Sequence, residues 1–182
     1  MKCIAIILLA LAGFTSQTPP GLYVCKNAKV SLYSEAPIED ISAETNTGAS
    51  VFNPATGELV FSITISSLVF PKSLMQEHFN TDYMESDKFP KATFKGKIQQ
   101  SIDVTKNGTY PVTVSGELEV HGVKQTRTIT GSIIVNNGAV SMASEFYVKC
   151  ADHNITIPKL VFHNIAESVR IRVAAAYSPY KQ

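Results

Sequence analysis

The sequence predicts an all-β fold, in which antiparallel strands close into a barrel or stack as a sandwich beside one short helix. Three observations lead to this prediction. The chain of 182 residues is rich in the β-branched and hydroxyl side chains that are typical of such folds. Apolar and polar residues alternate with a period of two over long segments. Short turn signals with Asn, Gly or Pro separate these segments, so most strands are expected to be joined by hairpins.

Each alternating segment gives its expected strand one apolar face and one polar face. The clearest segments are residues 58–66, 110–122, 127–135 and 167–175. Strands of this kind belong to antiparallel sheets that cover a core on one side. About eight or nine of them would expose their edges unless the sheet closes or stacks. The Asn-Gly pair at 137–138 predicts a tight hairpin, because both residue types tolerate positive φ.

One apolar stretch breaks the period of two and predicts the single helix, over residues 73–84. Ser73, with Gln76 three residues later, matches a capping box, so the helix is expected to begin there. Pro90 blocks helix beyond the loop that follows. The spacing i, i+4 and i+8 places on one helical face Met75, Phe79 and Tyr83. This stripe needs an apolar partner, and we expect it to be buried against the barrel or its mouth.

Residues 1–16 are predicted to be a secretory signal peptide. Lys2 precedes an apolar run of about a dozen residues, and small and polar residues follow that run. Cleavage after Ala12 or after Ser16 fits this layout, and an uncleaved membrane anchor stays open as the alternative. The rest of the chain is expected to form one domain over residues 21–177, which is periplasmic or secreted.

The balance of charges argues against nucleic acid as a partner. Lys and Arg together number 16, against 15 Asp and Glu, and no basic patch stands out. The sequence carries none of the short motifs of nucleotide-binding, serine-hydrolase, metalloprotease or dithiol redox sites. We therefore expect a protein that is not an enzyme and that uses no cofactor.

A metal site is the alternative that the histidines leave open. His78 and Asp82 lie four residues apart on one face of the expected helix, next to the apolar stripe. With a further histidine, His121 or His163, they would form a small metal site and support a metal-assisted hydrolase. The simpler hypothesis is a structural pair without metal that holds the helix to its loop or to the barrel, because such pairs are common at this spacing.

Two cysteines follow the predicted signal peptide, Cys25 and Cys150. Export permits a disulfide, and a closed sheet can bring the first strand beside a late one. Cysteines also pack as small hydrophobic side chains, so a bridge and a pair of reduced thiols are both compatible with the sequence.

Several motifs follow one another in a specific order. They are "LMQEHFNTDYMESDKFPKATFKGKI", "GTYPVTVSGELEVHGVKQTRTITGSIIV", "SEFYVKCADHNITIPK" and "VRIRV". Together they resemble the YceI-like family of exported polyisoprenoid-binding proteins, over roughly residues 21–175. The sequence departs from the family pattern at His153, where an aromatic residue usually follows the aspartate.

The resemblance implies a lipocalin-like antiparallel barrel with the helix beside it and an apolar cavity inside. The implied ligand is a polyisoprenoid or an isoprenoid-quinone-like molecule, which the protein would carry, buffer or scavenge under stress. The residues expected to line the cavity are Phe61, Ile63, Met75, Phe79, Phe94, Leu118, Val120, Phe146 and Val148. Apolar side chains suit a ligand chain that forms no hydrogen bonds, and methionine adapts to irregular shapes. Transient contact with a membrane is compatible with this hypothesis.

Overall fold

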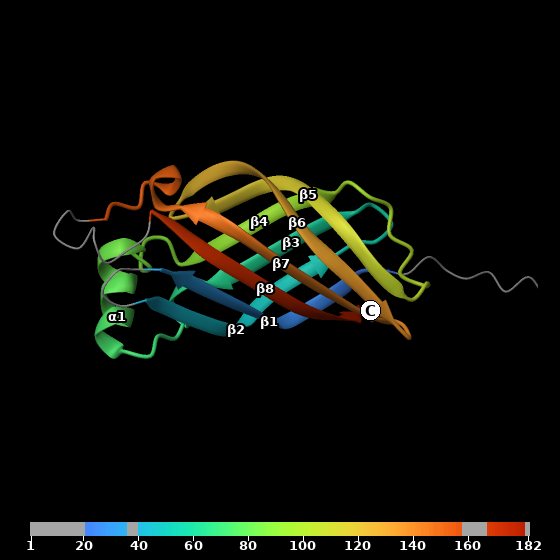
Figure 1. Ribbon diagram of the computed structural model, residues 1–182, viewed down its shortest axis with the longest axis horizontal. Coiled ribbons are helices and arrows are strands. Elements are labelled where there is room, and N and C mark those ends of the chain that lie inside the picture. Colours follow the sequence, from blue (N-terminus) through green and yellow to red (C-terminus); the bar gives the residue numbers. More distant parts are fainter. Residues whose placement is uncertain (1–20, 36–39, 158–166, 181–182) are drawn as a thin grey trace, which may run out of the picture.

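Eight antiparallel strands close into one barrel, in which each strand pairs with its neighbour in the chain and β8 pairs with β1 (Figure 1). The computed structural model describes residues 21–35, 40–157 and 167–180. The strands are β1 (Tyr23–Ser34), β2 (Ile41–Phe52), β3 (Glu58–Thr64), β4 (Lys91–Ile98), β5 (Gly108–Val120), β6 (Val123–Asn136), β7 (Ala139–Lys149) and β8 (Ser168–Pro179). The predicted antiparallel barrel is therefore confirmed, and the sandwich is excluded. The predicted signal peptide lies outside the described residues.

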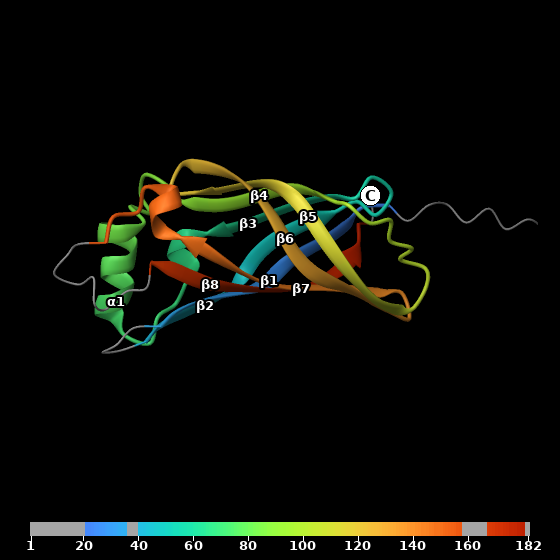
Figure 2. The same cartoon turned by 45° about the horizontal axis from the view of Figure 1, so that its top comes forward.

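The barrel has two different ends, which we call the turn end and the helix end. The turn end carries the short connections between β2 and β3, between β4 and β5 and between β6 and β7 (Figures 1 and 2). Asn137 and Gly138 form the last of these with φ of 48° and 82°, as the Asn-Gly signal predicts. At the helix end α1 (Ser73–His78) lies across the barrel (Figures 1 and 2).

The helix begins at Ser73 as predicted, but the capping box is wrong. Lys72 is the N-cap residue and no side chain caps the helix there. Gln76 instead accepts a hydrogen bond from the Phe70 backbone N–H through its Oε1, at 3.2 Å. This contact fastens the incoming chain to the first turn of the helix. A π-helical turn (Phe79–Tyr83) completes the predicted element.

The chain between β3 and α1 takes the place of a strand along part of β2. β2 pairs with β3 at four positions, from Ala49 to Phe52. Nearer the helix end, Glu44 forms an isolated antiparallel bridge with Val69, with backbone hydrogen bonds of 3.1 and 2.9 Å. This bridge leaves the flanking Leu68 and Phe70 buried, 3% and 6% exposed. The helix end therefore has its own small apolar cluster.

The two cysteines lie at opposite ends of the barrel, so the disulfide alternative is wrong. Both thiols are free and buried. Cys25 of β1 lies opposite Ser50 of β2 near the turn end. Cys150 directly follows Lys149, which lies opposite Ser168 of β8 at the helix end. A disulfide requires Cα atoms within about 7 Å, and most of a strand length separates these two. They pack as small hydrophobic side chains, the other alternative from the sequence.

Within the residues that the structure describes, no helix has both the length and the apolar character needed to cross a membrane.

Candidate ligand-binding cavity

A cavity of about 510 Å³ runs inside the barrel and reaches the helix end. Its volume lies within the range of about 300–1,000 Å³ that is usual for small-molecule sites. All nine residues proposed from the sequence line it: Phe61, Ile63, Met75, Phe79, Phe94, Leu118, Val120, Phe146 and Val148. For the seven on strands the alternation is the reason, because every second side chain points into a barrel, whereas Met75 and Phe79 reach the cavity from the helical segment.

Cross-strand rows place the large side chains of the wall. Phe61 of β3 lies opposite Phe94 of β4, and Phe94 lies opposite Leu118 of β5. On the other side of the barrel Phe146 of β7 faces Ile171 of β8. Directly opposite side chains are the closest neighbours in a sheet, so these rows form continuous apolar walls.

Two glycines allow the backbones of β4 and β5 to approach each other closely beside the Phe94 ring. Gly96 of β4 lies opposite Gly116 of β5. A Cβ at Gly116 would lie 2.4 Å from the Gly96 Cα, and a Cβ at Gly96 would lie 2.8 Å from the Phe94 ring. Any larger residue at either position would displace the backbone or the ring, so this pair fixes where Phe94 sits in the cavity.

At the helix end the cavity is covered by the predicted stripe, which is half-buried rather than fully buried. Met75 and Phe79 pack on the cluster that contains Leu68 and Phe70, and the Phe70 and Phe79 ring centroids are 4.8 Å apart. Tyr83 also lines the cavity, and burial raises its pKa. The stripe is only partly buried because it faces a cavity and not a packed core.

At the turn end the cavity is closed by packed aromatic rings. Phe52 is fully buried between Tyr23 and Tyr177, with centroid distances of 6.4 and 6.3 Å. The Tyr177 hydroxyl lies 2.6 Å from Ser50 Oγ, and Ser50 Oγ donates to the Val60 carbonyl at 2.9 Å. Tyr177 therefore donates its own proton to Ser50. Burial raises the pKa of Tyr177 to about 12.

His78 and Asp82 form the expected pair on the helix, with Nδ1 2.6 Å from Oδ2. Hydrogen bonds from His78 and then Thr81 hold the pKa of Asp82 below its usual value. Both side chains are about half-exposed, and the pair lies within one helical segment. It therefore does not tie the helix to the barrel, which corrects that part of the hypothesis.

The remaining described histidines hold the chain after β7 against the β5–β6 turn. His121 donates a hydrogen bond through Nδ1 to the His153 carbonyl at 3.1 Å, and its Nε2 lies 3.3 Å from Glu85 Oε2. His153 is fully buried and donates through Nδ1 to the Val123 carbonyl. This burial explains the place of His153, the residue at which the sequence departs from the family pattern.

The metal alternative requires several ligating side chains that meet at one point. In residues 21–35, 40–157 and 167–180, no three His, Cys, Asp or Glu side chains gather as a metal site would need. His163, one of the two further ligands considered, lies outside the described residues.

Sequence reasoning missed the contribution of β1, β2 and the end of β8 to the cavity. The additional lining residues there include Val30, Leu32, Ile41, Ala175 and Tyr177. In β1 the register with β2 shifts between Cys25 and Ala28 and again between Ala28 and Val30. These irregularities interrupt the period of two, which is the signal that located the other strands.

The comparisons with known proteins agree with this architecture. The model of the YceI-like domain matches residues 26–177. The chain belongs to the YceI-like family. No curated protein matches the sequence.

Solved structures of YceI-like and related proteins share the fold at low sequence identity. A polyisoprenoid-binding domain from Saccharophagus degradans superposes with a TM-score of 0.73 at 13% identity, covering 88% of this chain and 99% of that one. Burkholderia cenocepacia BcnA gives 0.70 at 18%, covering 83% and 96%. A Campylobacter jejuni YceI protein gives 0.57 at 13%, covering 100% of both chains. At such identities these similarities establish the shared fold.

Proposed function

We propose that this YceI-like protein binds a lipid with a long apolar chain, of the polyisoprenoid or isoprenoid-quinone kind, inside its barrel. The observation that carries the proposal is the chemistry of the cavity wall. Among the described residues that line it, none is Asp, Glu, Lys or Arg, and most are aliphatic or aromatic. A branched hydrocarbon chain would gain about 25 cal/mol for each Å² of apolar surface that it buries there.

The structural neighbour from Saccharophagus degradans supports the same ligand class, because that protein is described as a polyisoprenoid-binding domain. The predicted signal peptide supports a site of action in the periplasm or outside the cell. In that setting we propose a carrier, buffer or stress-related scavenger of the lipid, with no catalytic step and no cofactor.

Extraction of bound lipid tests this proposal. Protein purified from its native host is extracted with organic solvent, and the extract is examined by mass spectrometry. We expect a stoichiometric isoprenoid lipid. The same preparation is examined for metal, because stoichiometric zinc that depends on His78 would favour the hydrolase instead.

Two cavity variants and one control sharpen the test. Leu118→Asp places a carboxylate among apolar side chains and should abolish lipid loading, because an unpaired buried charge is costly. Val60→Asp is the matched control, since Val60 is 41% exposed and does not line the cavity. Val120→Trp fills the cavity without adding charge, so it tests the same point if Leu118→Asp fails to fold. Unchanged loading in folded variants of both cavity residues would refute the proposal.

A further inference from the structure

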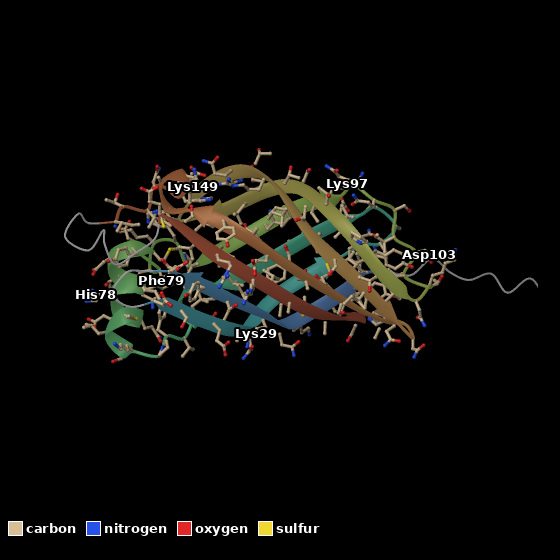
Figure 3. All side chains as sticks on the ribbon, viewed as in Figure 1. Lys29, His78, Phe79, Lys97, Asp103 and Lys149 are labelled. Carbon is tan, nitrogen blue, oxygen red and sulfur yellow. The ribbon has the colours of Figure 1, made fainter. Side chains whose placement is uncertain are left out.

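The polar groups of the cavity differ between its two ends. At the turn end the Tyr177 hydroxyl already donates to Ser50, so a ligand meets no free donor there. At the helix end His78 lines the cavity and is the one described lining residue with an imidazole ring, whose two nitrogens can form hydrogen bonds. A ligand with one polar end therefore finds its best partner at the helix end, beside water. Figure 3 labels His78 and Phe79 at this end and Asp103 at the other.

The hydrogen bond to Asp82 sets which nitrogen of His78 is available. An ionised carboxylate accepts hydrogen bonds and cannot donate, so the proton between them lies on Nδ1. In the neutral imidazole Nε2 then carries the lone pair and accepts hydrogen bonds. None of the described residues is bonded to Nε2. Asp82 thus orients the ring so that Nε2 can accept a hydrogen bond from a hydroxyl group.

The described lining of the cavity offers no cation to hold an anionic ligand. A phosphate or diphosphate group is usually held by Arg or Lys side chains, and the described lining supplies neither. The Asp82 carboxylate bonds to the same histidine and would lie near an anionic group held there. Like charges repel across a few ångströms at a protein surface strongly enough to change affinity.

We infer that His78, positioned by Asp82, accepts a hydrogen bond from an uncharged hydroxyl end of the ligand, and that the cavity selects such lipids over their phosphorylated forms. This inference rests on the proposed function, because it specifies the polar end of the lipid that the cavity would hold. Asp82 is a positioning residue, and its carboxylate also contributes the selection against anions.

Three probes of equal chain length test the inference on the purified, delipidated protein. They are geranylgeraniol, geranylgeranyl diphosphate and the saturated hydrocarbon phytane, and each is titrated against a bound fluorescent apolar dye. We expect the alcohol to bind at least about tenfold more tightly than the diphosphate. His78→Leu should weaken binding of the alcohol by about 3- to 10-fold, the effect of one net hydrogen bond, and leave phytane unchanged.

Two further variants separate positioning from general damage. Asp82→Asn removes the carboxylate and should reduce the difference in affinity between the alcohol and the diphosphate. Glu77→Leu is the control on the same helix, outside the cavity lining, and should leave binding of the alcohol unchanged. Equal or tighter binding of the diphosphate would overturn the inference, as would equal losses for the alcohol and phytane in His78→Leu. If the wild-type protein binds none of the three probes, the proposed function fails as well.

Discussion

The turn end and the helix end of the barrel close the same cavity by different means. At the turn end, aromatic rings from β1, β2 and β8 pack into a core, and Phe52 is completely buried. At the helix end, α1 and the π-helical turn cover the cavity with half-buried side chains, and neither element has a fully buried residue. Packing at the turn end therefore contributes more to the stability of the barrel, and the cavity approaches solvent at the helix end.

The largest expected difference between the two ends is in the cost of removing a phenyl ring. Phe52→Ala should lower the free energy of unfolding by about 3–5 kcal/mol, because the ring is fully buried and leaves a void. Phe79→Ala should cost about 1–2 kcal/mol, since its ring is half-buried and already borders empty space. Urea denaturation of the lipid-free wild-type protein and of both variants measures these losses in the free energy of unfolding. Equal losses would show that the helix end is packed as firmly as the turn end.

The next effect concerns Tyr177 at alkaline pH. Burial raises its pKa from 10.0 to about 12, so the native state keeps a proton that the unfolded state loses. The stabilisation is complete below pH 10 and declines as the pH rises through 12. Between pH 8 and 12 the wild-type protein should lose about 2–3 kcal/mol more stability than Tyr177→Phe.

Tyr83 at the helix end supplies the comparison for this pH effect. Burial raises its pKa too, but this side chain is more exposed than that of Tyr177. Tyr83→Phe should therefore protect against alkaline unfolding less than Tyr177→Phe. Thermal unfolding followed by circular dichroism at several pH values checks both variants. A larger protective effect of Tyr83→Phe than of Tyr177→Phe would contradict the conclusion that the turn end is the more tightly packed end.

The smallest expected effect is that of reducing agent. Cys25 lies near the turn end and Cys150 at the helix end, both as free thiols. Dithiothreitol should leave the unfolding midpoint unchanged, and a thiol reagent should find two thiols in the denatured mature protein. Burial raises the pKa of Cys150, so its thiol should react slowly in the native state. A missing pair of thiols in the monomer would contradict the strand register.

Local patterns in the sequence were sufficient to predict most of the wall of the cavity. Phe61, Phe94 and Leu118 lie on strands of regular alternation, and alternation alone decides which face a side chain occupies. The helix was located because its apolar spacing differs from that of the strands. Regular segments are predictable because their side-chain directions depend on the chain itself.

Long-range pairing decided what the sequence left open. The sequence allowed both a barrel and a sandwich, and the pairing of β8 with β1 determines the choice. It also allowed a bridge between Cys25 and Cys150, which the strand register places at opposite ends.

The sequence by itself determined the all-β class, the single helix and the apolar faces that line the cavity. Tertiary structure decided that Gln76 bonds to the Phe70 backbone instead of forming a capping box, and that Tyr177 meets Ser50 across the turn end. The physical reason is the range of the interactions. Alternation and helical spacing are properties of neighbouring residues, whereas closure, register and the partners of polar groups depend on segments that meet only in the folded chain.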